Sequence, residues 1–286
     1  MIKLVMTDLD DTLVPQGQDG ASDYALAAVH TLLDAGVRFG PVSGRVQSSM
    51  GWMFHNDEPC YQTGAFANGQ VLYLDGKHVR TVSIDGAVLE ELAQYLAHDE
   101  LKVGARLAIV VRDNPNNTAV VEFVHEHPEL LRDDAPSWLQ GDFIPHATAP
   151  TYVKANVPCV ASYDEVLALR ERLTARFPEL RFVMPSNDVP LIDILPASWD
   201  KGKGVLALAE AMGIAADEVA VFGDSENDLA MIRAIPNSVA VANAATEVQE
   251  AARWHIGASA DEAVADALLQ IAEAAKTGTM PAFMRA

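Results

Sequence analysis

Cysteine is scarce in this chain, and its placement excludes two classes of protein. The 286 residues include only two cysteines, Cys60 and Cys159, and they lie too far apart in sequence for a familiar zinc-binding spacing. Two isolated cysteines also exclude the disulfide framework of a small secreted domain. We therefore expect both thiols to be reduced and buried, in a protein of the cytoplasm.

Positive charge is scarce as well, and long apolar runs are missing. Twenty lysines and arginines stand against 40 aspartates and glutamates, which gives a net charge of −20. Nucleic acid and anionic membrane surfaces require a basic face, so we expect neither as a partner. No segment approaches eighteen uncharged apolar residues, and the N-terminus carries no signal-peptide pattern, so we expect no membrane anchor. A small anionic ligand is compatible with this charge, because a few local cations are enough to hold one.

Strand-like and helix-like patterns alternate near both ends of the chain. Residues 2–8 and 37–44 are typical of buried strands. Residues 22–36 between them form an amphipathic helix pattern that starts at Ser22 or Asp23 and stops at Gly36. The same alternation returns over residues 200–275, and we expect a loosely ordered tail after it. This order predicts an α/β fold with a Rossmann-like parallel sheet and helices on both of its faces.

The middle of the chain differs from its ends. Residues 85–185 contain hairpin-like pairs of strands together with two helix patterns, which is typical of an antiparallel α+β domain. We therefore expect a core domain made of residues 1–84 and 186–286, and an α+β domain of residues 85–185 inserted into it.

Acidic residues follow two of the predicted core strands. Asp8 and Asp10 come at the end of the first strand, and Asp224 and Asp228 follow the strand at 218–224. Either group alone is more often a solvated turn. Ligands of an open parallel sheet bind beyond the carboxyl ends of its strands. Carboxylates clustered there are too costly unless a cation or protons neutralise them. Oxygen ligands of this kind favour Mg²⁺.

Two further features are suited to holding an anion. Ser43 and Gly44 end the second strand, where a hydroxyl and backbone N–H groups form an anion cradle. Lys201 opens a helix, which is the unfavourable end for a cation unless an anion lies nearby. Lys203 competes for that role, and spacing alone does not choose between the two lysines.

Four short stretches in this order resemble the motifs of one enzyme superfamily. They are "DLDDTLV" at 8–14, "SGR" at 43–45, a helix start "KG" at 201–202, and "GDSEND" at 223–228. The chain resembles the haloacid dehalogenase-like hydrolases, and within them the Cof-like sugar-phosphate phosphatases. The turn "ANG" at 67–69 agrees with that branch.

The resemblance implies a role for each residue of the first motif. Asp8 would attack phosphorus and ligate Mg²⁺. Asp10 would protonate the leaving oxygen and later deprotonate water, while its backbone carbonyl binds the metal. Thr12 would orient the loop. Asp11 stands where glycine is often found, and we expect no part for it in the chemistry.

The other motifs would bind phosphate and metal. Ser43 and Gly44 would hold the transferring phosphoryl group, with Ser43 standing where threonine is more usual. Lys201 matches the family lysine better than Lys203 does. Asp224 would be a metal ligand, Asn227 a phosphate contact, and Asp228 an orienting or water-mediated metal partner.

The resemblance also makes the inserted domain a mobile cap that chooses the leaving group. Its candidates for that choice are Arg106, Arg112, His125, His127 and Trp138. The sequence thus predicts a Mg²⁺-dependent phosphatase of a small phosphorylated metabolite, such as a sugar phosphate, acting as a monomer or homodimer through an aspartyl-phosphate. The alternatives are a phosphotransferase such as a phosphomutase, and a catalytically silent metabolite-binding protein.

Overall fold

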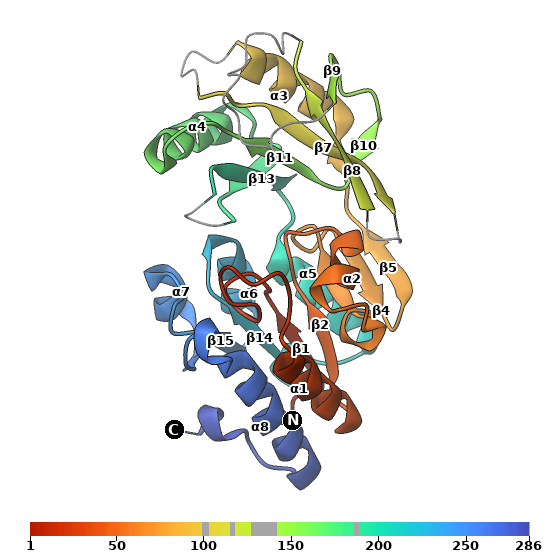
Figure 1. Ribbon diagram of the computed structural model, residues 1–286, viewed down its shortest axis with the longest axis vertical. Coiled ribbons are helices and arrows are strands. Elements are labelled where there is room, and N and C mark those ends of the chain that lie inside the picture. The colour runs from red at the N-terminus through yellow and green to blue at the C-terminus, as the bar shows by residue number, and fades with distance from the viewer. Residues whose placement is uncertain (99–102, 115–117, 127–141, 186–188, 286) are drawn as a thin grey trace. The chain divides into compact units, whose positions relative to one another are not determined.

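The chain divides into two compact units, each of which is described by itself (Figure 1). The structure is a computed structural model that describes residues 1–98, 103–114, 118–126, 142–185 and 189–285. Met1–Thr81 and Asp200–Ala286 form the core unit, and Val82–Trp199 form the inserted unit. The second boundary lies later than the predicted 185/186, because strand β13 (Leu191–Pro196) pairs with β11 (Ala155–Pro158) and β12 (Leu180–Val183) in the inserted unit's sheet.

The core unit is built on a five-stranded parallel sheet in the order β16-β15-β14-β1-β2. Its helices and strands are β1 (Leu4–Thr7), α1 (Asp23–Asp34), β2 (Arg38–Pro41), α2 (Met50–Met53), β3 (Gly64–Phe66), β4 (Val71–Leu74), β5 (Lys77–Thr81), α5 (Lys201–Met212), β14 (Val219–Gly223), α6 (Leu229–Ala234), β15 (Asn237–Ala240), α7 (Thr246–Ala251), β16 (Trp254–His255) and α8 (Ala263–Thr277). The first strand lies between one early and one late strand, so distant parts of the sequence meet at its end.

Helices cover both faces of this sheet, as predicted. On one face, Val5, Phe39 and Phe222 pack in a buried cluster with α1 and α8. Because side chains alternate along a strand, the buried Leu4 and Met6 point to the other face. Helices α5 and α6 pack together, and α6 contacts β14 and β15. All four residues of β1 are buried, as in a strand covered on both sides.

Helix ends follow the residues that the sequence offers. Helix α1 begins after Ser22, whose Oγ accepts a hydrogen bond from the Ala25 N–H at 3.0 Å. Helix α5 begins after Asp200, whose carboxylate accepts from the Lys203 N–H at 2.9 Å. It ends at Gly213, which adopts the left-handed conformation with φ 65°. The start of α5, where Lys201 lies, is therefore fixed by its cap.

Two parts of the core unit differ from the expectations. Strands β3, β4 and β5 form a separate antiparallel sheet that the sequence patterns did not reveal. The C-terminal tail was expected to be loosely ordered, and that prediction is wrong. Residues Ala282–Met284 form a 3-10 helix in which Met284 is buried, and Phe283 stacks against Phe222 of β14 with ring centroids 6.3 Å apart. Apolar contact with the core orders the tail.

The inserted unit is an α+β domain with a six-stranded sheet in the order β12-β13-β11-β7-β8-β9. Besides the three strands already named, its elements are β6 (Ile84–Asp85), α3 (Gly86–Ala97), β7 (Leu107–Asn114), β8 (Thr118–Val124), β9 (Phe143–Ile144), β10 (Thr151–Tyr152) and α4 (Tyr163–Arg176). Its main core lies on one face of the sheet, where Ile109, Val157 and Ile194 pack with α3 and α4. The other face carries the alternate residues, which include several polar ones.

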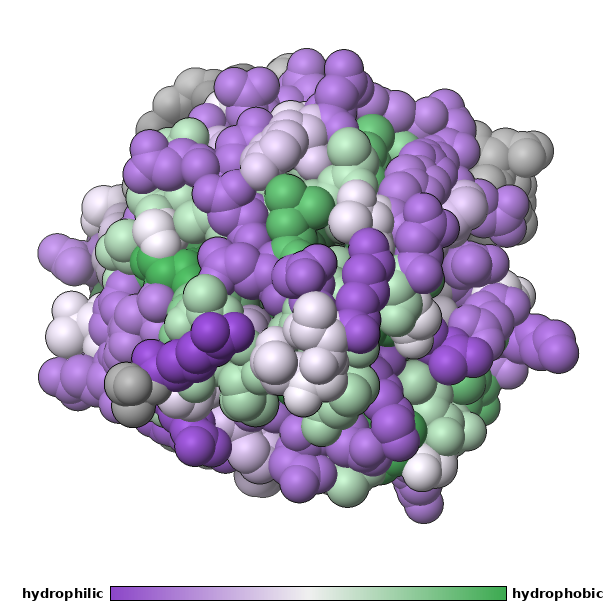
Figure 2. Space-filling model, turned by 90° about the horizontal axis from the view of Figure 1, so that it is seen from below, coloured by the Kyte–Doolittle hydropathy of each residue, from purple (hydrophilic) through white to green (hydrophobic). Residues whose placement is uncertain are grey.

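One face of the molecule is mainly polar. In the face shown in Figure 2, hydrophilic side chains cover most of the area and apolar ones lie between them in small groups. Within the described ranges, none of the helices combines the length and the apolar character needed to cross a membrane.

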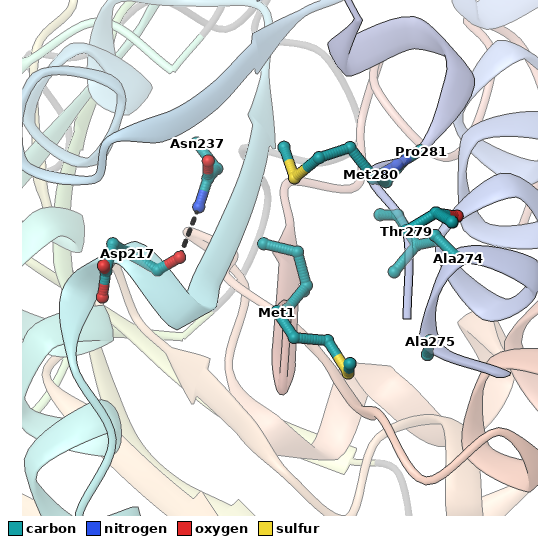
Figure 3. A pocket seen from close by; sticks show the side chains of 10 residues that line it. Met1, Asp217, Asn237, Ala274, Ala275, Thr279, Met280 and Pro281 are labelled. Atoms are coloured by element: carbon teal, nitrogen blue, oxygen red, sulfur yellow. Dashed lines mark hydrogen bonds between the residues drawn. The ribbon is translucent and has the colours of Figure 1, made fainter. Parts of the chain in front are cut away.

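A small pocket marks the amino ends of the core strands. It lies where Met1 precedes β1, Asp217 precedes β14 and Asn237 begins β15 (Figure 3). Asn237 Nδ2 donates to the Asp217 backbone carbonyl at 2.8 Å, and apolar side chains such as Met280 form much of the remaining wall. The predicted catalytic residues lie at the opposite, carboxyl ends of these strands.

Candidate active site

Three aspartates meet at the carboxyl edge of the parallel sheet. Asp8 follows β1 and Asp224 follows β14, and the Asp8 N–H donates to the Phe222 carbonyl at 2.9 Å, which continues the pairing of the two strands. Asp228 closes the short 3-10 helix Glu226–Asp228. One carboxylate oxygen from each of the three lies within 4.8 Å of the others, and we call them the acidic cluster. The structure thus brings together three of the four predicted metal-binding aspartates.

Lys201 lies between two members of the acidic cluster. Its Nζ donates to Asp8 Oδ1 and to Asp228 Oδ1, each at 2.6 Å, and its side chain has no exposed surface. Lys203 is exposed. The geometry therefore selects Lys201 as the lysine of the site, a choice that spacing alone left open. Among the described residues, the second oxygen of Asp8, Oδ2, accepts no hydrogen bond, so it is the oxygen open to a ligand.

Hydrogen bonds fix the other two carboxylates. Thr12 Oγ1 donates to Asp224 Oδ1 at 2.7 Å. This hydrogen bond joins the loop after β1 to the motif at 223–228. Asp228 Oδ2 accepts from the backbone N–H groups of Asp224 at 3.0 Å and Ser225 at 3.2 Å. Each member of the acidic cluster is held in place by a neighbouring motif.

The electrostatics of the acidic cluster call for a cation. Burial raises the pKa of Asp8 well above its ordinary value, and the neighbouring carboxylates raise it further, while Lys201 opposes them. Burial, followed by Asp228, raises the pKa of Asp224 to about 7. One lysine faces three carboxylates, so an excess of negative charge is left in a buried place. The oxygen donors and their charge fit Mg²⁺.

Asp10 does not join the acidic cluster through its side chain. Its two carboxylate oxygens accept a pair of hydrogen bonds from Arg45, at 2.8 Å from Nε and 2.7 Å from Nη2. The Arg45 guanidinium in turn lies 5.2 Å from the centroid of the Trp52 ring. Arg45 belongs to the "SGR" stretch, but no role was predicted for it. A sequence signal for this pair does exist. Arg45 follows β2 and Asp10 follows β1, and these two strands are neighbours in the sheet.

The predicted phosphate-binding residues border the acidic cluster. Ser43 follows β2, the neighbour of β1, and its buried Oγ accepts from the Arg45 N–H at 3.1 Å. Gly44 follows it in a bend that is half-buried. Asn227 belongs to the same 3-10 helix as Asp228, and its Nδ2 donates to Asn68 Oδ1 at 3.4 Å. The sequence predicted Asn68 only as part of the turn at 67–69. Its hydrogen bond with Asn227 links that turn to the motif at 223–228.

Two glycines allow the turn to reach helix α5. Gly69 has φ +85°, and a Cβ on it would lie 3.2 Å from the Cα of Gly204. A Cβ on Gly204 would lie 2.8 Å from the Cα of Gly69, which real side chains do not tolerate. This close backbone contact at the first turn of α5 seats Lys201 at the end of the sheet.

Asp11 occupies a left-handed backbone conformation with φ 60°. This conformation explains why glycine suits the position. The Asp11 carbonyl accepts from Asn243 Nδ2 at 2.8 Å, so the residue serves the shape of the loop.

The candidates for leaving-group choice belong to the inserted unit. Arg106 is buried, with its guanidinium 5.9 Å from the Phe123 ring and 5.7 Å from the Phe143 ring. His125 is also buried, and its backbone N–H donates to the Ile144 carbonyl at 3.1 Å. Arg112 lies in β7. His127 and Trp138 lie outside the described residues.

The chain matches one family model and is similar to several named proteins. A family model described as haloacid dehalogenase-like hydrolase matches residues 5–268. A protein of Haemophilus influenzae named as a phosphatase is 23% identical, over 88% of this chain and 91% of its own length. A phosphoglycolate phosphatase of Methanothermobacter thermautotrophicus is 43% identical over 27% of this chain, a match that spans 35% of that enzyme.

Solved structures share the fold over nearly the whole chain. SMU.1108c from Streptococcus mutans has a TM-score of 0.77 at 16% identity, covering 94% of this chain and 98% of its own. A haloacid dehalogenase-like hydrolase from Bacteroides thetaiotaomicron has a TM-score of 0.72 at 20% identity, covering 95% of this chain and 100% of its own.

Proposed function

This chain belongs to the haloacid dehalogenase-like hydrolases, and from that membership we propose that it is a Mg²⁺-dependent phosphatase of a small phosphorylated metabolite. The family and the relatives named as phosphatases make it a phosphoric monoester hydrolase. The finer proposal is that the substrate is a sugar phosphate or a closely related ester, and that hydrolysis passes through an aspartyl-phosphate.

One observation carries the proposal: Lys201 holds one oxygen of Asp8 and leaves the other open within a site that has excess negative charge. A carboxylate fixed by a buried lysine is a pre-oriented nucleophile. The same lysine provides a positive charge beside the transferring phosphoryl group, where such charge lowers the barrier most.

The acidic cluster would hold the metal. Asp8, Asp224 and Asp228, with the backbone carbonyl of Asp10, are the proposed ligands, since carboxylate and carbonyl oxygens are what Mg²⁺ prefers. When bound, Mg²⁺ would neutralise charge on the transferring phosphoryl group.

The proposed reaction has two steps on the protein side. In the first step, Asp8 Oδ2 forms a bond to phosphorus while the bond from phosphorus to the leaving oxygen breaks, and Asp10 gives that oxygen a proton. In the second step, water attacks phosphorus, the bond to Asp8 breaks, and Asp10 accepts the proton from water. To act as the acid, Asp10 has to turn from Arg45, which holds both of its oxygens, and take up a proton from solvent before the first step.

Ser43, Gly44 and Asn227 are the proposed contacts of the phosphoryl oxygens. Ser43 and Gly44 offer a hydroxyl and backbone N–H groups beside the strand that carries Asp8. Asn227 offers an amide close to Asp228. The proposed candidates for choosing the leaving group all belong to the inserted unit, and they are Arg106, Arg112, His125, His127 and Trp138.

The test is phosphate release from a panel of metabolite phosphates, with and without Mg²⁺, by the unaltered protein and by Asp8→Asn. We expect Mg²⁺-dependent release from sugar phosphates, and its loss in Asp8→Asn with an unchanged circular dichroism spectrum. Undiminished turnover in Asp8→Asn would overturn the mechanism. Transfer of phosphate to an added sugar in place of water would favour a phosphotransferase, and tight binding without turnover would favour a silent binding protein.

The proposal also includes a cellular location and an oligomeric state. The cytoplasm is the expected location, because two isolated buried thiols suit a reducing compartment. A monomer or homodimer is the expected assembly, which light scattering on the purified protein would measure.

A further inference from the structure

A second group of metal-type ligands lies in the core unit. His30 of α1 and the residues Asp57 and Cys60 place an imidazole nitrogen, a carboxylate oxygen and a thiol sulfur within 4.8 Å of one another. Cys60 ends the 3-10 helix Glu58–Cys60, and Asp57 is its N-cap residue. Among the described residues, no hydrogen bond joins this group to the acidic cluster, so it is a separate feature of the fold.

Asp57 is the centre of this group. Its Oδ2 lies 2.6 Å from His30 Nε2, and one of its carboxylate oxygens lies within 4.8 Å of the Cys60 sulfur. The backbone is shaped for this arrangement, because His55 and Asn56 both adopt positive φ, at 52° and 61°, directly before Asp57. Two left-handed residues in succession turn the chain so that Asp57 points at helix α1.

The chain's other cysteine shows what is unusual about Cys60. Cys159 lies in the apolar core of the inserted unit, where its Sγ donates to the Val157 carbonyl at 3.7 Å. Cys60 is equally buried, yet its sulfur lies within 4.8 Å of an Asp57 carboxylate oxygen. Burial, followed by the charge of Asp57, raises the pKa of the Cys60 thiol to about 12.

We propose that His30, Asp57 and Cys60 bind a divalent ion of the Zn²⁺ class, in a site distinct from the acidic cluster. Imidazole, thiolate and carboxylate are together the ligand set of Zn²⁺, whereas Mg²⁺ takes oxygen alone. On binding, the ion forms a bond to the Cys60 sulfur and the thiol proton leaves to solvent, with no change of oxidation state.

The distances allow this site with a small local adjustment. Tetrahedral Zn²⁺ with bonds of ~2.0–2.3 Å places its ligand atoms roughly 3.3–3.7 Å apart. The three donor atoms already lie within 4.8 Å of one another, and the His30 to Asp57 contact would open by about 1 Å. The His30 side chain is 46% exposed and that of Asp57 28%, so an ion reaches the site from solvent and water completes the fourth position.

Cobalt titration of the full chain under reducing conditions tests the proposal. Co²⁺ bound to a thiolate gives a near-ultraviolet charge-transfer band, and Co²⁺ in the all-oxygen acidic cluster does not. We expect one such band per chain, displaced by added Zn²⁺. It should be absent in Cys60→Ser, and it should be unchanged in Cys159→Ser and in Asp8→Asn.

A second variant keeps the test decisive if Cys60→Ser does not fold. His30→Asn alters a half-exposed side chain outside the core, and we expect it to weaken Co²⁺ binding, read from the same band, by about tenfold or more. Three outcomes would overturn the proposal: no band at excess Co²⁺, a band that survives Cys60→Ser, or equal Co²⁺ affinity in His30→Asn. Because the readout is a thiolate band, the outcome of this test does not depend on whether the protein has phosphatase activity.

Discussion

Each of the two units buries one lysine against aspartate, and the two lysines have different surroundings. In the core unit, Lys201 donates to two aspartates and faces a third carboxylate in the acidic cluster. In the inserted unit, Lys154 donates to Asp193 Oδ1 at 2.6 Å. Asn156 Nδ2 donates to the same oxygen of Asp193. The first group leaves negative charge in excess, whereas in the second the described residues show an ion pair of Lys154 with Asp193.

This difference separates a site from a structural ion pair. A buried pair of matched charges, with hydrogen bonds to its oxygens, is complete as it stands. A lysine outnumbered by carboxylates is not, and in the core unit burial and mutual repulsion raise the pKa of both Asp8 and Asp224. Buried lysine by itself therefore says little about function. The charge around it indicates whether a ligand is required.

The largest expected effect comes from removing the core lysine. Lys201→Met takes the cation from Asp8 and from the phosphoryl group, and we expect turnover to fall by at least about 10²-fold. Lys154→Met is the matched control, since it removes an equally short contact to aspartate in the other unit. Steady-state kinetics on both variants, with folding checked by circular dichroism, make the comparison. Equal losses of turnover would contradict the distinction between the two lysines.

The next effect concerns the stability of the inserted unit. Lys154→Met removes the ammonium group that lies 2.6 Å from Oδ1 of Asp193, a side chain that is only 2% exposed. We expect a loss of about 3 kcal/mol in the free energy of unfolding, the usual cost of breaking a buried pair. Adding Asp193→Asn removes the buried negative charge and keeps the shape of the side chain, so the double variant should regain much of that loss. Denaturant unfolding measures both, and an additive double variant would show that the pair is not coupled.

A smaller effect links Mg²⁺ to pH. With the pKa of Asp224 at about 7 against an ordinary 3.8, the metal-free native state binds more protons than the unfolded chain between these values. Its stability therefore falls as pH rises through that window. Mg²⁺ requires ionised carboxylates, so it should raise the melting temperature more at about pH 8 than at about pH 5.5. Asp224→Asn should remove most of this difference, and equal Mg²⁺ shifts at both pH values in the unaltered protein would contradict the reasoning.

The sequence predicts the features that depend on local patterns of residues, and it misses those that depend on contacts between distant side chains. The parallel sheet and the meeting of Asp8 with Asp224 follow from strand and helix periodicity, because parallel strands end at one edge. The pairing of Asp10 with Arg45 depends on side-chain directions that periodicity does not contain. The ordered tail was missed because its contact, Phe283 on Phe222, joins an irregular segment to a distant strand. The tertiary fold brings His30, Asp57 and Cys60 together. Their spacing in the sequence therefore does not predict a metal site.

The smallest effect we expect is on the affinity for Mg²⁺, and it comes from a single hydrogen bond to the acidic cluster. Thr12 Oγ1 donates to Asp224 Oδ1 at 2.7 Å, and this hydrogen bond opposes the rise in the pKa of Asp224. Thr12→Val removes the donor at nearly constant volume, at a cost of about 1 kcal/mol, which corresponds to roughly fivefold weaker Mg²⁺ binding. Thr12→Ser keeps the hydroxyl and should bind Mg²⁺ as the unaltered protein does. Mg²⁺ titration of activity measures all three proteins. If Val and Ser weaken Mg²⁺ equally, packing of the threonine methyl group and not its hydrogen bond sets the position of Asp224.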